Sequence, residues 1–205
     1  MKRWIWLMCL VLACFTQRAA AQWTVIDPSN LVQNIKSAVQ SSTTASNMIK
    51  SLQESVKIYN QSKAYYDALK AVHNIIKDAR KVKLTIEMVS EITDIYMSGF
   101  NRMVTDRNFT SGELAAISAG YARLLEESNG VLQDLRQVIN VSTLSMTDKD
   151  RMDVVDRCYY EMRRYRNLVS YYTNKNIAVS YLRARKKNDL DRVMRLYGNE
   201  ISKYW

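Results

Sequence analysis

The stretch LVQNIKSAVQSSTTASNMIKSLQESVKIY, residues 31–59, decides the fold class of this chain. Apolar or small residues recur in it at alternating steps of three and four, and this stripe is formed by Leu31, Ile35, Ala38, Ser42, Ala45, Ile49, Leu52, Val56 and Tyr59. A heptad stripe of this kind predicts a helix that packs side by side with other helices over many turns. The sequence therefore predicts a long helix at the start of a helical bundle.

The stripe continues toward the C-terminus with one irregularity. It slips near Lys63 and resumes from Tyr66 to Tyr96, and the segment 98–113 has the composition of a loop. The crowded stretch KDARKVKL, residues 77–84, is a second point where the chain could bend. Residues 22–104 are thus expected to form either one long helix or a helical hairpin that folds back near 79–83.

The rest of the chain also carries helical patterns. Thr110 to Glu113 has the form of a capping box and predicts a helix over 110–141. Residues 147–205 are expected to form basic C-terminal helices, the first capped by Thr147 or Asp148 and a short last one starting near 188–189. With only 5 glycines and 1 proline among 205 residues, few breaks are available and no segment alternates as a strand would. The predicted fold class is all-α: a single elongated helical bundle over 22–205, with long N-terminal helices and a shorter C-terminal helical part.

The first 21 residues predict a signal peptide. Lys2 and Arg3 precede an apolar run from Trp4 to Phe15, which is much shorter than the roughly 20 residues that cross a bilayer. The small residues Ala19 to Ala21 then suit a cleavage site before Gln22. The two alternatives are an uncleaved membrane anchor, which would need a longer apolar run, and a lipoprotein acylated at Cys14. Either way the chain is expected to be exported, to a periplasm or to the cell envelope or surface.

The distribution of charge and the number of cysteines indicate where the chain is basic and whether it can form disulfides. The chain has a formal net charge of +10, and residues 147–205 hold 14 Lys or Arg against 8 Asp or Glu, a net 14 − 8 = +6. Cleavage at Gln22 would leave Cys158 as the single cysteine, so no internal disulfide is expected. Cys158 stands at an apolar helical position, which favours a small buried hydrophobe over an intermolecular bridge.

Catalytic and metal-binding patterns are missing from the sequence. The chain has one histidine, His73, beside an apolar face, and it has no His-x-x-x-His, cysteine pair or glycine-rich phosphate loop. The sequence therefore predicts no catalytic, cofactor-binding or metal-binding residues, no cofactor and no small-molecule substrate. An enzyme that uses a pair of carboxylates is the least favoured hypothesis.

The basic C-terminal third carries the first candidate binding residues. Arg163, Arg164 and Arg166 stand among tyrosines in RCYYEMRRYRNLVSYY, residues 157–172. Such side chains can contact the phosphates and bases of single-stranded nucleic acid, which gives the hypothesis of a binding module for DNA or anionic lipid. The favoured interpretation is that Tyr159, Tyr165 and Tyr172 pack inward while the arginines face water, anionic lipid or an acidic partner.

The mature N-terminus carries the second set of candidate residues. Trp23, Val25 and Ile26 are apolar, precede the first helical pattern, and are predicted to dock a partner protein. The competing hypothesis is a hydrophobic staple, in which Ile26 packs on Leu31 or Val32.

A family resemblance adds a biological setting. The stretch from Ala21 to Tyr96, which opens AQWTVIDPSNLVQNIKSAVQ, resembles the TraI proteins of conjugative transposons, an exported family distinct from the relaxase of the same letters. It is similar, more distantly, to the TrbJ proteins of plasmid transfer systems, through Val25, Ile26, Asp27, Pro28 and Asn30. The resemblance implies a component of a type IV secretion, mating-pair-formation apparatus, comparable with its helical minor pilus subunit, and it brings no catalytic residues. Some TrbJ-like chains carry cysteine pairs that the mature chain here lacks.

The resulting hypothesis is an exported, non-enzymatic assembly subunit of a conjugative DNA-transfer apparatus that acts by helix-mediated docking. Its expected partners are other proteins of that apparatus. A homo-oligomer and contact with a membrane surface stay open, whereas nucleic acid is not an expected partner. The second hypothesis is the binding module for DNA or anionic lipid in the basic C-terminal third.

Overall fold

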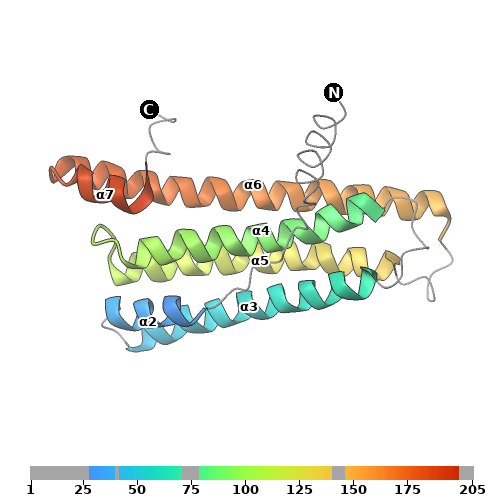
Figure 1. Cartoon of the computed structure of the whole chain (residues 1–205), viewed down its shortest axis with the longest axis horizontal. Coiled ribbons are helices and arrows are strands. Elements are labelled where there is room, and N and C mark those ends of the chain that lie inside the picture. The colour runs from blue at the N-terminus through green and yellow to red at the C-terminus, as the bar shows by residue number, and fades with distance from the viewer. Residues whose placement is uncertain (1–27, 40–41, 71–78, 140–145, 199–205) are drawn as a thin grey trace, which may run out of the picture.

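The computed structural model of the chain is an elongated bundle of helices (Figure 1). It describes residues 28–39, 42–70, 79–139 and 146–198. Six helices form this part of the chain: α2 (Ser29–Ala38), α3 (Ser42–Lys70), α4 (Ala79–Val104), α5 (Ser111–Ile139), α6 (Asp148–Lys186) and α7 (Leu190–Tyr197). No strand occurs among these residues, so the predicted all-α bundle is confirmed.

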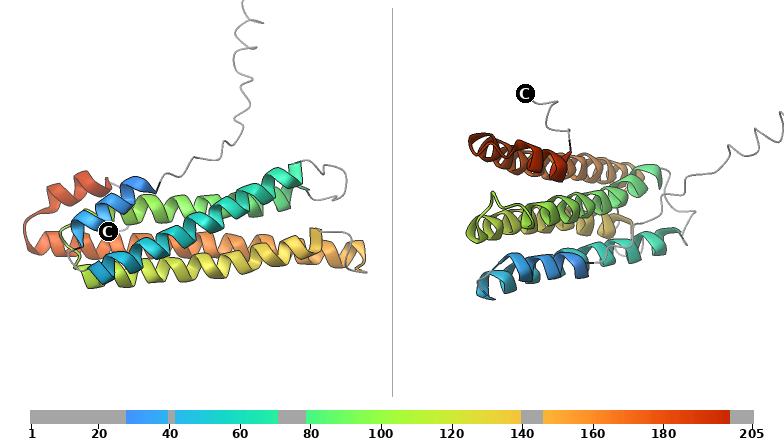
Figure 2. Two further views of the ribbon diagram at one scale, coloured as in Figure 1. Left: turned by 90° about the horizontal axis from the view of Figure 1, so that it is seen from below. Right: turned by 60° about the vertical axis from the view of Figure 1, so that its left-hand side comes forward.

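The four long helices set the architecture. α4 and α5 lie side by side in the middle, with α6 against them on one side and α3 on the other (Figures 1 and 2). The short helices are additions at one end, where α2 contacts α3 and α4 and α7 contacts α6. α6 thus has one face on the α4–α5 pair, and this arrangement determines which of its side chains remain exposed.

The N-terminal part of the bundle contains a helical hairpin rather than one continuous helix. α3 and α4 contact each other along the bundle, so the chain folds back between Lys70 and Ala79. A second interruption was not predicted. The apolar stripe of the sequence continues past Ala38, but the helix ends there. The next residue, Val39, has an extended backbone with φ of −106° and ψ of 107°. Val39 is buried there, so α2 can turn back on α3 while keeping its apolar side in the core.

Aromatic rings fill the centre of the bundle. The Tyr121 ring of α5 stacks on Tyr96 of α4 at 4.6 Å and meets Tyr172 of α6 edge-on at 5.0 Å. Gly120 makes room for the second contact, since a Cβ at this position would overlap the Tyr172 hydroxyl. Three helices therefore meet at Tyr121, and as predicted Tyr159, Tyr165 and Tyr172 pack against this core.

Helix ends follow the sequence signals. The predicted capping box at Thr110 is confirmed, because the Glu113 amide donates to Thr110 Oγ1 at 3.3 Å and the Thr110 amide donates to Glu113 Oε2 at 2.9 Å. Thr147, one of the two predicted caps of α6, forms a second box with Asp150. The last helix starts after Asp189, whose side chain makes no capping hydrogen bond, and it ends at Gly198, whose φ of 76° lies in the left-handed region that suits glycine.

Glu113 also joins α5 to α6, which gives a testable pH dependence. Arg183 donates to its carboxylate at 2.5 Å, and this bond, with those from Thr110, lowers the pKa of Glu113 from 4.5 to about 2. The unfolded chain therefore binds a proton that the folded chain does not, so this stability is present above pH 4.5 and is lost as the pH falls toward 2.

Replacing Glu113 by glutamine is expected to lower the free energy of unfolding by about 1 kcal/mol at pH 7, since Gln keeps the cap but loses the partly exposed ion pair. Urea unfolding of both proteins should show this difference shrinking as the pH falls through 4.5 toward 2. An equal difference at pH 7 and pH 2 would contradict the assignment.

Candidate docking surface

The outward face of α6 carries large apolar side chains that no other part of the described chain covers. We call this face the outer stripe and define it by Tyr160, Leu168, Tyr171, Val179 and Leu182, all exposed. Tyr160 and Tyr171 expose 59% and 60% of their surface, which is far from the burial expected of packed tyrosines. Elsewhere among the described residues, Met194 of α7 is the one further large apolar side chain of this kind.

The outer stripe lies opposite the face that α6 buries. Cys158, Val169 and Ser180 are buried, and each is followed two positions later by Tyr160, Tyr171 or Leu182. Two residues advance a helix by about 200°, so the exposed and buried residues stand on opposite sides. α6 therefore has two apolar faces, and the bundle covers one of them.

A shallow open groove marks the first half of the outer stripe. It has a volume of about 440 Å³ and is lined by Tyr160, Arg163, Arg164, Asn167, Leu168 and Tyr171. Further along, the Lys175 ammonium lies 5.4 Å from the centre of the Tyr171 ring, within the range of a cation–π contact. Aromatic, aliphatic and cationic groups thus alternate along one solvent-facing surface, a composition that favours recognition of another macromolecule.

The three arginines singled out by the sequence do not share one role. Arg163 and Arg164 are exposed and line the groove, and neither forms an ion pair with another described residue. Arg166 instead donates to Glu91 Oε2 of α4 at 2.6 Å, so its guanidinium holds α6 on the bundle. The part of Arg166 in docking stays a prediction, because its side chain is still 45% exposed beside this ion pair. Trp23, Val25 and Ile26 lie outside the described residues.

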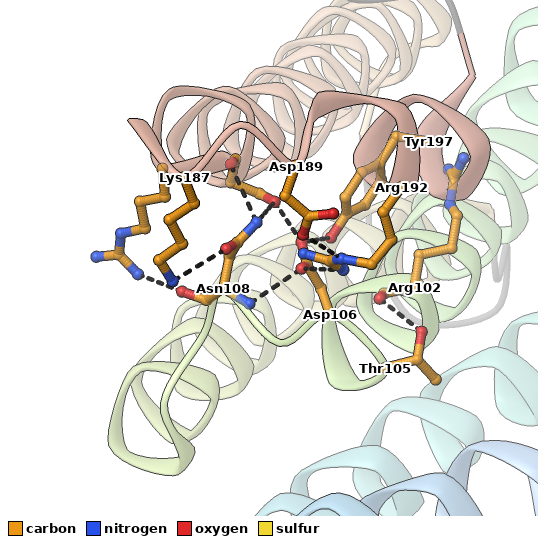
Figure 3. Close-up of polar contacts among 10 residues, drawn as sticks. Arg102, Thr105, Asp106, Asn108, Lys187, Asp189, Arg192 and Tyr197 are labelled. Carbon is orange, nitrogen blue, oxygen red and sulfur yellow. Dashed lines mark hydrogen bonds and ion pairs between the residues drawn. The ribbon is translucent and has the colours of Figure 1, made fainter. Parts of the chain in front are cut away.

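A buried carboxylate that the sequence did not indicate lies at the end of the bundle where α7 packs (Figure 3). Asp106, in the loop between α4 and α5, is 2% exposed. Its carboxylate accepts hydrogen bonds from Tyr197 at 2.9 Å, Arg192 at 3.1 Å, the Asn108 amide at 3.0 Å and the Ser180 hydroxyl. Because four donors of the chain surround it, this carboxylate ties the loop to α6 and α7 rather than facing a ligand.

The neighbours of Asp106 complete a network at this end. Asn108 donates to the Ser180 carbonyl at 3.2 Å, and Arg183 donates to the Asn108 carbonyl at 2.7 Å. Burial and the nearby Asp106 carboxylate raise the pKa of Tyr197, so its hydroxyl remains a donor at neutral pH. The cluster is a structural joint, and the candidate binding surface lies along α6.

The buried thiol of Cys158 is held in its protonated, unreactive form. Cys158 is 1% exposed, and burial raises the pKa of its thiol to about 11, so the thiolate needed for nucleophilic chemistry is scarce near pH 7.

Within the described ranges, no group of three or more His, Cys, Asp or Glu residues could hold a metal ion. None of the helices described is both long and apolar enough for a membrane span. His73 lies outside the described residues.

Comparison with known protein families gives a match at the start of the chain. Residues 4–52 are similar to a family described as a domain of unknown function, DUF4141. No curated protein and no solved structure matches the chain. The match covers the start of the chain up to the first part of α3, so the outer stripe on α6 falls outside it.

Proposed function

We propose that this chain is a non-catalytic assembly subunit that binds another protein through the outer stripe of α6. The resemblance to the TraI and TrbJ families supplies the setting of the proposal: an exported subunit of a conjugative, type IV secretion apparatus. The observation that carries the docking part is the set of five large apolar side chains exposed along one face of a single helix.

The outer stripe leaves large apolar side chains exposed to water, and this favours docking. Single exposed apolar side chains are ordinary on protein surfaces, whereas several gathered on one face are typical of interaction sites. Tyrosine is also among the residues whose truncation at an interface costs the most, often about 2 kcal/mol or more. The groove beside Tyr160 and Tyr171 gives a partner side chain a place to insert.

A second function draws on the same surface. The exposed Arg163 and Arg164 beside Tyr160 could bind single-stranded DNA or anionic lipid. Retention of either ligand by the purified chain at low salt, with release as salt rises, would favour this alternative. The aliphatic members Leu168, Val179 and Leu182 favour a protein partner over DNA, because they offer phosphates and base edges nothing to bind.

The test is a transfer assay in donor cells. The triple variant Tyr160→Ala, Tyr171→Ala and Leu182→Ala is expected to reduce transfer at least about 100-fold, since losing two or three interface anchors weakens binding by this order. Its thermal midpoint should change by less than about 3 °C, because exposed substitutions rarely alter stability by more than about 0.5 kcal/mol.

The matched control removes three exposed side chains from another helix. Glu126→Ala, Gln133→Ala and Gln137→Ala change the solvent-facing side of α5 and should leave transfer within about twofold of the unmodified chain. Normal transfer by the Tyr160, Tyr171 and Leu182 variant would refute docking through the outer stripe. A large loss of stability would instead show that these side chains support the bundle itself.

A further inference from the structure

The outer stripe repeats every 11 residues. Its members are spaced by eight, three, eight and three positions, so Tyr160, Tyr171 and Leu182 are separated by 11 each time, as are Leu168 and Val179. A cation occupies the middle of each gap of eight, Arg164 in the first and Lys175 in the second. Each unit therefore presents an aromatic residue, a cation and an aliphatic residue at steps of four.

An 11-residue repeat determines the course of the stripe along α6. Eleven residues in three turns give about 3.67 per turn, slightly above the 3.6 of an α-helix, so the stripe drifts around the helix by about 20° in 11 residues, whereas a heptad stripe drifts by about 20° in seven. The outer stripe therefore drifts little from a straight line over the 23 residues from Tyr160 to Leu182, which are 22 steps of 1.5 Å or roughly 33 Å. A straight apolar line of this length suits a second straight helix lying beside α6.

The charge around the stripe excludes a second copy of the same face. Residues 157–187 contain nine Lys or Arg and one acid, Glu161, a net 9 − 1 = +8. Two such faces in contact would bring Arg164 and Lys175 against like charges with water removed, which is strongly unfavourable. A partner that covers these two cations must supply carboxylates, because a buried charge left unpaired costs several kcal/mol.

We infer that the outer stripe binds a straight α-helix of another protein that carries Asp or Glu at 11-residue spacing, each flanked four positions before and after by apolar residues. The inference rests on the proposed docking function and names the chemistry of its partner. The carboxylates pair with Arg164 and Lys175, and the flanking apolar side chains cover Tyr160 and Leu168 in the first unit and Tyr171 and Val179 in the second. The pattern is the same in either chain direction, so it holds for parallel and antiparallel docking.

The test is photocrosslinking of the full chain in cells that carry the complete transfer system. A photoreactive phenylalanine analogue replaces Leu168 in one variant and Val179 in another, with Gln133 on the exposed side of α5 as the control position. Mass spectrometry identifies the cross-linked segment. The expected result at both stripe positions is a segment of another protein that shows the acid and apolar pattern described above.

The other outcomes separate the two proposals. A cross-linked protein segment without these acids, or residues 157–187 of a second copy, would overturn the inference and leave docking through the stripe intact. Cross-linking no stronger than at Gln133, or adducts with lipid or DNA alone, would overturn the docking function as well.

Charge variants test the cations directly. Arg164→Glu combined with Lys175→Glu is expected to reduce the cross-link yield at least tenfold, and replacing the facing partner acids by lysine should restore it. The matched control is Lys50→Glu with Lys57→Glu, two exposed lysines of α3, which should leave the yield unchanged. An unchanged yield after reversal of Arg164 and Lys175 would overturn the inference, and circular dichroism of each variant confirms that the bundle remains folded.

Discussion

Replacing Asp106 by alanine is expected to destabilise the protein by about 3–5 kcal/mol, among the largest effects of any single substitution in this chain. The carboxylate is buried at the junction of the α4–α5 loop with α6 and α7 (Figure 3). Its removal leaves the buried Tyr197 and Ser180 hydroxyls without this acceptor, and the Arg192 guanidinium keeps only its contact with Asp189. Buried donors left without an acceptor carry the full cost of their lost hydration.

Urea unfolding followed by circular dichroism measures this loss. Asp134→Ala, which removes an exposed aspartate from α5, is the matched control and should change stability by less than about 0.5 kcal/mol. Tyr197→Phe removes one of the donors to Asp106 and should cost about 1 kcal/mol. If Asp106→Ala were as stable as Asp134→Ala, the network would not hold α7 and the loop in place.

Replacing Tyr121 by alanine is expected to cost a similar 3–5 kcal/mol, for a different reason. The ring is fully buried between α4 and α6, where it contacts the rings of Tyr96, Phe100 and Tyr172. Truncation leaves a cavity at the point where three helices meet, and helices that are held apart by their other packed side chains can close it only in part. The expected signs are a lower urea midpoint and a lower thermal midpoint.

The variant Tyr121→Phe keeps the ring and removes only the hydroxyl, so it measures what the hydroxyl alone contributes to stability. Burial raises the pKa of Tyr121, so its hydroxyl remains protonated and contacts Thr173 Oγ1 at 2.7 Å. Thr173 Oγ1 still donates to the Val169 carbonyl at 2.8 Å, so loss of the tyrosine hydroxyl should cost about 1 kcal/mol or less. Equal losses for the alanine and phenylalanine variants would show that the hydrogen bond, and not the packing of the ring, governs this site.

Much of the fold could be predicted from local signals. Steps of three and four identify helices because side chains three or four positions apart share one face, and this holds in α3, α5 and α6 alike. The caps at Thr110 and Thr147 could be found because a cap depends on residues within one turn. The break at Val39 could not, since the helical pattern of the sequence continues through it and only the packing of α2 on α3 and α4 requires the turn.

The candidate site was predicted in part. Arg163 and Arg164 stood out by charge and do line the groove, while Arg166 has the same local sequence character but reaches Glu91 in α4. The exposed Tyr160 and Tyr171 were missed because neighbouring tyrosines at 159 and 172 pack inward, and adjacent tyrosines look alike in a sequence. The 11-residue spacing of Tyr160, Tyr171 and Leu182 is the signal that could have revealed them.

The sequence by itself determined the long helices, the caps at Thr110 and Thr147 and the two apolar faces of α6, since all of these depend on residues within a few turns of one another. Only the tertiary structure decided which face of α6 is covered, because that depends on where α4 and α5 lie. It also buried Asp106, whose partners Ser180 and Tyr197 are 74 and 91 positions away along the chain. Such contacts exist only once the bundle has brought distant segments together, and so both the outer stripe and the Asp106 network are products of packing.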